Sequence, residues 1–213
     1  AGVYFFIALP LLTAFAYSWS VSYDRNSGYI SQIITRTSRK KYFTAKFLVT
    51  FISGGIIFAG ALILDYVLLA IFSPAYTPIP GDLASSMDPF HFCSEIFYQN
   101  PYLFMLIWFG IAFLWGGAMS CISMAAGMLI KKYVISSIVP FLVFTAEQIL
   151  ALYVMQRYTI TIKGTSIGLV WTDMLYAAPM TTSFPEHILL CIALIIMIST
   201  LIYILRGRKY ECL

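Results

Sequence analysis

Two apolar stretches flank a polar, basic one near the start of this 213-residue chain, and this alternation is the feature that most constrains its fold. Residues 1–22 and 47–72 are each long enough to cross a hydrocarbon core of about 30 Å as a helix rising about 1.5 Å per residue. Charged residues make up 10% of the chain, well below the roughly 25% of a soluble domain. The sequence therefore predicts an all-α, polytopic membrane protein.

Further apolar segments repeat this pattern to the end of the chain and form a single transmembrane domain over residues 1–213. The expected spans are 1–22, 47–72, 102–130, 133–156 and 186–205. Small residues inside the spans predict places where two helices approach closely. These residues are Gly54, Gly55, Gly60, Gly116, Ser120, Ser123 and Gly127.

Basic residues indicate how the spans are oriented. Six of the thirteen Lys and Arg lie at 23–46, a segment that we call the basic connector, and five more lie at 131–132 and 206–209. Because Lys and Arg in short loops stay on the inner side, we expect these segments and the C-terminus in the cytoplasm. Five spans then place residue 1 outside, so we expect six spans in the native chain, the first preceding this sequence. The placement of the charges needs no nucleic-acid partner.

The basic connector contains a short amphipathic pattern. Its apolar residues recur at a spacing of three and four, on one face of a helix, and are Tyr29, Ile30, Ile33 and Ile34. Asn26 or Ser27 would cap this helix, and Asp24 would lie near its positive end. The pattern leaves two interpretations open, because an apolar stripe fits a groove in a partner protein and also a layer of lipid headgroups.

The arrangement resembles the permease subunits of the ABC type-2 exporters, which typically have six spans and a cytoplasmic coupling helix between the second and the third. The positions that the resemblance assigns to ATPase coupling are Asp24, Arg25, Gly28, Tyr29, Ile30, Ile33, Ile34 and Arg36. The basic turn at 39–41 and Lys46 at the start of the next span also match. The family more often has Glu at the position of Asp24.

The resemblance implies a permease of the bacterial plasma membrane that exports an amphipathic or peptide-like substrate, such as an antimicrobial peptide, by alternating access. A second permease copy or a related permease would complete the pathway in the lipid bilayer. Separate ABC ATPase subunits would bind ATP and Mg, because no GxxxxGK[ST] phosphate loop occurs in this chain. A passive channel or membrane anchor would also explain the spans, but it would leave the amphipathic segment without a task.

Polar groups inside the spans are candidates for substrate contact. Asp65 lies in the span 47–72, and Glu147 and Gln148 lie in the span 133–156. Helical rise places them about 12–14 Å from the outer ends of these spans. An ionisable group at this depth is costly and suggests a function. The alternative is a structural pair with Arg157, Lys163, a Tyr or a Thr, or a neutral, protonated carboxyl group.

Motifs that would suit an intramembrane enzyme or a metal site are incomplete. GTSIG at 164–168 matches the nucleophile elbow GxSxG and is followed by Asp173 and His187, but the elbow requires a sheet. His91 and Cys93 supply only two metal ligands. The four cysteines have no CxxC spacing and indicate no disulfide framework. We therefore expect no catalytic residue, metal or cofactor in this chain.

Overall fold

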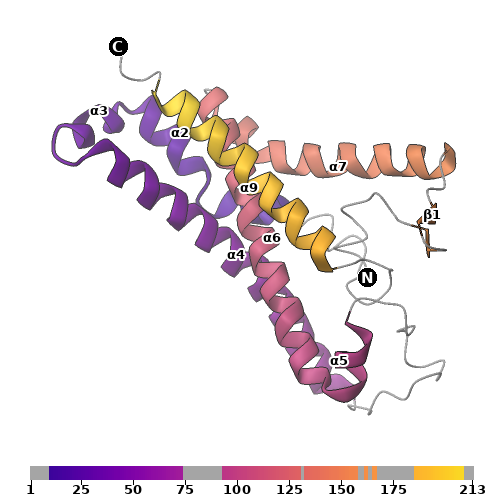
Figure 1. The fold of residues 1–213 in the computed structure, drawn as a ribbon. Helices are drawn as coiled ribbons and strands as arrows, with labels where there is room; N and C mark the ends of the chain where they lie inside the picture. Colours follow the sequence, from indigo (N-terminus) through magenta and orange to yellow (C-terminus); the bar gives the residue numbers. More distant parts are fainter. Residues whose placement is uncertain are drawn as a thin grey trace.

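The computed structural model describes residues 10–73, 93–130, 132–157, 161–162, 165–166 and 185–208. Nearly all of these residues are helical, which confirms the predicted helical fold (Figure 1). Residues 10–16 are helical and are followed by α2 (Trp19–Asn26), α3 (Tyr29–Ile34), α4 (Arg39–Phe72), α5 (Ser94–Gln99), α6 (Pro101–Leu129), α7 (Tyr133–Arg157) and α9 (Pro185–Arg208). The strands β1 (Thr161–Ile162) and β2 (Thr165–Ser166) form one short antiparallel pair.

Two of the helices are long and apolar enough to cross a membrane. They are the 33-residue segment Lys40–Phe72 of α4 and the 29-residue α6. Shorter apolar segments lie in α7 and α9, at Tyr133–Ala146 and Ile192–Arg206. The ends of α6, α7 and α9 agree with the predicted spans to within three residues. Six spans in the native chain remain a prediction.

Helices α4 and α6 touch through their backbones. A Cβ atom added to Gly54 would lie 2.8 Å from the carbonyl oxygen of Gly116, and one added to Gly116 would lie 2.3 Å from Cβ of Phe58. Gly55 and Gly117 are equally crowded, by the rings of Phe113 and Phe51. The predicted close approach is therefore confirmed at Gly54, Gly55 and Gly116, whereas the contact at Gly117 was not predicted. At Gly60 the predicted approach is wrong among the described residues, because a Cβ atom added there would have none of their atoms within 4 Å.

A second set of small residues packs α6 against α2 and α7. The hydroxyl groups of Ser18 and Ser123 lie 2.7 Å apart, and the Ser123 hydroxyl donates to the Ser136 carbonyl over 3.0 Å. The Ser22 hydroxyl donates to the Gly127 carbonyl over 3.3 Å. All four serines are buried, so hydrogen bonds between helices hold this contact as well as close packing.

The first predicted span, 1–22, is wrong as a single helix. A turn at Tyr17 and Ser18 separates residues 10–16 from α2, which then continues to Asn26. The Ser18 hydroxyl bonds to the Ala14 carbonyl, four residues earlier, and Thr13 bonds to the Pro10 carbonyl. Serine and threonine side chains that bond back to the chain in this way compete with the helical ladder and bend it.

Helix α9 packs on α6, whereas α7 runs away from the place where the other helices cross (Figure 1). The first turns of α7 are well covered, where Ser136, Ser137, Pro140 and Phe144 are buried. Phe144 joins a core made with α4, α6 and α9, whose other large members include Phe58, Leu62, Phe104, Trp115, Met119, Ile192 and Ile195. The core therefore depends on α6, which contacts every other long helix.

The contact between α4 and α6 predicts opposite effects for two glycines in the same helix. Gly116→Ala should destabilise the protein by about 1–3 kcal/mol, because its methyl group has no room. Gly110→Ala should be neutral or stabilising by up to about 1 kcal/mol, since Gly110 has no neighbour within 4 Å and Ala favours a helix. Thermal unfolding of the two purified variants in the same detergent measures the difference. Equal unfolding temperatures would contradict the packing.

Candidate functional site

The basic segments of the sequence meet at one end of the molecule. The ring centroids of Tyr203 in α9 and Phe43 in α4 lie 5.2 Å apart, and Arg25 donates to the Met128 carbonyl in the last turn of α6. The basic connector, the turn between α6 and α7 and the last turns of α9 therefore share this end (Figure 1). Its exposed basic residues are Arg36, Lys40, Lys41, Lys132 and Arg206.

The predicted short helix of the basic connector is confirmed as α3, but its predicted cap is wrong. Gly28 occupies the N-cap position with φ 72°, in the left-handed region that favours glycine. Ser27 is instead the C-cap residue of α2. The glycine lets the chain turn between two helices within two residues, so α3 begins directly after α2.

Helix α3 turns part of its apolar face toward its own chain. Ile30 is 7% exposed and Ile33 is half-buried, and the side chain of Ile34 lies outside the described residues. Tyr29 is 47% exposed, and Gln32 and Arg36 are exposed as well. A partner at this end would therefore meet Tyr29 and polar side chains, and would not meet Ile30.

Asp24 and Lys46 form an ion pair that joins α2 to α4. Lys46 Nζ lies 2.5 Å from Asp24 Oδ2, and both side chains are about nine-tenths buried. The Tyr42 hydroxyl donates to the same carboxylate oxygen over 2.6 Å. Lys46 also donates to the Tyr17 hydroxyl over 3.3 Å and lies 4.9 Å from the centre of that ring. These four residues, Tyr17, Asp24, Tyr42 and Lys46, are the Asp24–Lys46 cluster.

Arg25 joins the same turn of α2 to α6. Its Nη1 donates to the carbonyl oxygens of Gly127 over 3.1 Å and Met128 over 3.0 Å. These carbonyls belong to the last turn of α6, where a helix has unpaired acceptors and a partial negative charge. Adjacent residues of α2 thus bond to α4 on one side and to α6 on the other.

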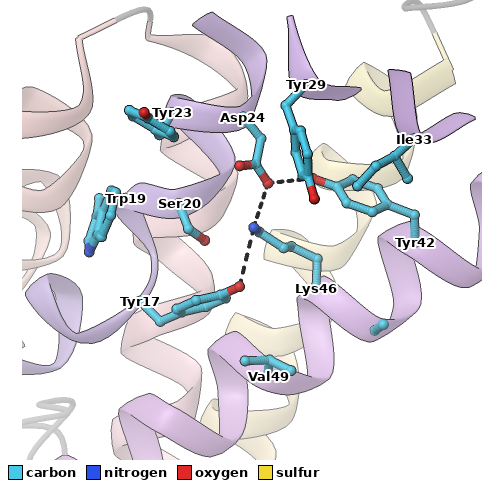
Figure 2. Close-up of a pocket in the computed structure, with 11 residues that line it drawn as sticks. Tyr17, Trp19, Ser20, Tyr23, Asp24, Tyr29, Ile33, Tyr42, Lys46 and Val49 are labelled. Carbon is cyan, nitrogen blue, oxygen red and sulfur yellow. Dashed lines mark hydrogen bonds and ion pairs between the residues drawn. The ribbon is translucent and has the colours of Figure 1, made fainter. Parts of the chain in front are cut away.

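An open cavity of about 350 Å³ lies beside the Asp24–Lys46 cluster (Figure 2). Apart from this cluster, it is lined by Trp19, Ser20, Tyr23, Tyr29, Ile33, Ala45 and Val49. Ser20 is 6% exposed, and its hydroxyl has no hydrogen-bond partner among the described residues. Figure 2 shows this hydroxyl directed toward the ion pair.

The sequence analysis did not select Tyr17, Ser20 or Tyr42. A signal was present, because Tyr17, Ser20 and Asp24 follow the spacing of one helical face, and Tyr42 precedes Lys46 by four residues. The spacing of Tyr17, Ser20 and Asp24 was overlooked because Tyr17 and Ser20 lie in the expected apolar span 1–22, where the turn at Tyr17 was not predicted. The coupling role of Asp24, Arg25 and the rest of the predicted set stays a prediction.

Asp65 lies away from this cluster, on an exposed face of α4. It has no hydrogen bond or ion pair with the described residues, and its neighbours Leu64, Leu68 and Leu69 are 61%, 48% and 57% exposed. The side chains of Glu147 and Gln148 lie outside the described residues. A role of these three residues in a substrate pathway also stays a prediction.

The enzyme and metal motifs lie largely outside the described residues, which include Ser166 in β2 but neither His91 nor Asp173. Burial raises the pKa of the Cys93 thiol, which disfavours the thiolate that a metal or a redox reaction would need. Among the described residues, no three His, Cys, Asp or Glu side chains lie close enough to share a metal.

Comparison of the chain with protein-family models, with curated proteins and with solved structures finds no match.

The geometry of the Asp24–Lys46 cluster predicts strongly coupled substitutions. Asp24→Asn or Lys46→Met alone should cost about 3–5 kcal/mol, because each leaves one buried charge without its partner. The double variant should be more stable than the sum of the single effects implies, since both charges are gone. Chemical unfolding in detergent of the unchanged protein and these three variants measures the coupling. Additive effects would show that the pair does not join α2 to α4.

Proposed function

We propose that this chain is the transmembrane permease subunit of an ATP-driven ABC exporter of the bacterial plasma membrane. It would move an amphipathic or peptide-like substrate out of the cell by alternating access. Separate ATPase subunits would supply the energy at the basic end, and a second permease copy or a related permease would complete the pathway. The basic end would face the cytoplasm, as the concentration of Lys and Arg there favours.

One observation carries this proposal. A short helix, α3, lies at the end of two membrane-length helices and is joined to both through the last turns of α2. The outer residues of α3 are exposed, while α2, which precedes it, is held by the buried Asp24–Lys46 pair and by the partly buried Arg25 bonds. A passive anchor has no need of such a bonded connection. A coupling helix requires one, because it has to transmit a movement of the partner to the membrane helices.

The bonds of α2 indicate how a movement of α3 would reach the membrane helices. A displacement of α3 acts on α2 through Gly28, and α2 acts on α4 through Asp24 and on α6 through Arg25. Because α4 and α6 are locked at their glycine contact, a force on their shared end would tilt them together. Alternating access would then use rigid-body motion of packed helices.

Asp65 supports the presence of a second subunit or a water-filled pathway. A carboxylate that faces lipid among leucine side chains is costly, and such groups usually face a protein interior or an aqueous cavity. On this chain the Asp65 face of α4 is uncovered by the described residues. In the complete transporter we place this face toward the second permease and the pathway.

Exposed tyrosines at the two ends of the molecule provide a test of ATPase docking. Tyr29→Ala in α3 should reduce co-purification of the ATPase at least tenfold, because aromatic anchors dominate protein interfaces. Tyr102→Ala, at the N-terminal end of α6, is the matched control, since Tyr102 is 76% exposed at the opposite end (Figure 1). Pull-down of a co-expressed ABC ATPase, from membranes with equal permease levels, gives the comparison. Equal recovery with both variants would remove the coupling role of α3.

A second test concerns Asp65. Asp65→Asn should weaken stimulation of the transporter's ATPase activity by a cationic amphipathic peptide, because the attracting charge is lost. Stimulation by a neutral analogue of that peptide should be unchanged, and Asp65→Glu should retain both responses. The measurement uses the permease and ATPase reconstituted together in vesicles. An unchanged response of Asp65→Asn to the cationic peptide would exclude Asp65 from the pathway.

A further inference from the structure

The cavity beside the Asp24–Lys46 cluster contains a polar group that no described part of the chain satisfies. The Ser20 hydroxyl is buried and has no hydrogen-bond partner among the described residues. A buried hydroxyl without a partner costs about 1–3 kcal/mol. Because this hydroxyl points into the cavity toward the ion pair, a ligand there could pair with it (Figure 2).

Hydrogen-bond donors converge on the same space. Lys46 has three N–H donors and uses one on Asp24 and one on Tyr17, so one remains. The Tyr17 hydroxyl accepts from Lys46, which leaves its own proton to donate. Together with Ser20, these groups suit a ligand that is rich in acceptor oxygens.

Charge at this end favours an anion. Asp24 is compensated by the ammonium of Lys46 and by the hydroxyl of Tyr42. Beyond this pair, the exposed charged side chains of the basic connector that follow Asp24 are cationic and include Arg36, Lys40 and Lys41. Clustered basic residues at a membrane surface attract anionic headgroups.

The rim of the cavity suits a membrane lipid better than a free ion. Trp19, Tyr23 and Tyr29 are 38%, 57% and 47% exposed, and such amphipathic rings favour the headgroup level of a bilayer. Val49 continues the lining toward the apolar part of α4 and is 46% exposed. The volume of about 350 Å³ also lies within the range of roughly 300–1,000 Å³ for small-molecule sites.

We propose that this cavity is a phospholipid site in which Ser20, Lys46 and Tyr17 bind the phosphate group and the aromatic rim holds the glycerol and upper acyl region. The site goes beyond the transporter proposal and does not depend on an ATPase or on a transported substrate. A lipid bound here would contact both helices that the Asp24–Lys46 pair joins.

The test uses the purified full chain in detergent with added phosphatidylglycerol, and native mass spectrometry to measure the bound lipid. Ser20→Ala should weaken binding roughly tenfold or more, because one hydrogen bond to a charged group is lost. Ser20→Leu should abolish it by filling the space next to Lys46. Ser31→Ala is the control and should bind normally, since the exposed Ser31 lies outside the cavity and its hydroxyl bonds to the Gly28 carbonyl.

Thermal unfolding separates loss of the site from loss of the fold. Without lipid, Ser20→Ala should unfold at the same temperature as the unchanged protein or above it, because the Ser20 hydroxyl has no hydrogen-bond partner among the described residues to lose. Added lipid should raise the unfolding temperature of the unchanged protein and of Ser31→Ala more than that of Ser20→Ala. If Ser20→Leu does not fold, Ser20→Ala alone decides.

Competition distinguishes a lipid from a free phosphate. Inorganic phosphate and glycerol 1-phosphate should displace the lipid only at concentrations at least a hundredfold higher, because they lack the acyl contacts. Displacement at equal concentration would overturn the lipid assignment in favour of a soluble phosphate compound. Equal lipid binding by the unchanged protein, Ser20→Ala and Ser20→Leu would overturn the site itself.

Discussion

The backbone contact between α4 and α6 is the constraint on which the other features depend. Gly54 and Gly116 allow the two helices to meet without intervening side chains, and this fixes their relative position. Lys46 lies about two turns before Gly54 in α4, and the carbonyls that Arg25 holds lie about three turns after Gly116 in α6. The contact thus sets the gap into which α2 fits at the basic end.

Helix α2 closes that gap because two adjacent residues of opposite charge point to different helices. Successive residues on an α-helix are about 100° apart, so Asp24 can reach α4 while Arg25 reaches α6. An apolar contact in place of either bond would keep the helices packed. It would not fix the orientation of α2 relative to α4 and α6, because apolar contacts are not directional. The Asp24–Lys46 pair is about nine-tenths buried, so water and salt weaken it little, whereas the Arg25 bonds are only partly buried.

The sequence predicted the helices well, and the turns and contacts between them less well. Apolar length alone located α6 and α9, and small residues located surfaces of close approach on α4 and on α6, because both signals are local. They did not predict that these two surfaces meet. The turn at Ser18 combines bonds back to nearby carbonyls with a contact to Ser123, 105 residues away, so the apolar pattern did not contain it. The burial of Ile30 is a property of the folded chain. Ser20 could not be selected from the sequence, because its significance lies in having no hydrogen-bond partner among the residues that the structure describes.

Occupation of the cavity and rigidity of the joint are linked through Lys46. Its ammonium group can serve Asp24, Tyr17 and a ligand at the same time, since it has three donors. A phosphate that binds only when Lys46 is held by Asp24 stabilises that arrangement by mass action. A phosphate that drew Lys46 away would leave Asp24 with Tyr42 alone and would loosen α2 from α4. The Asp24–Lys46 pair is buried and its charged atoms are close, so keeping the pair costs less free energy than breaking it. Lipid binding is therefore expected to make the contact between α2 and α4 more rigid.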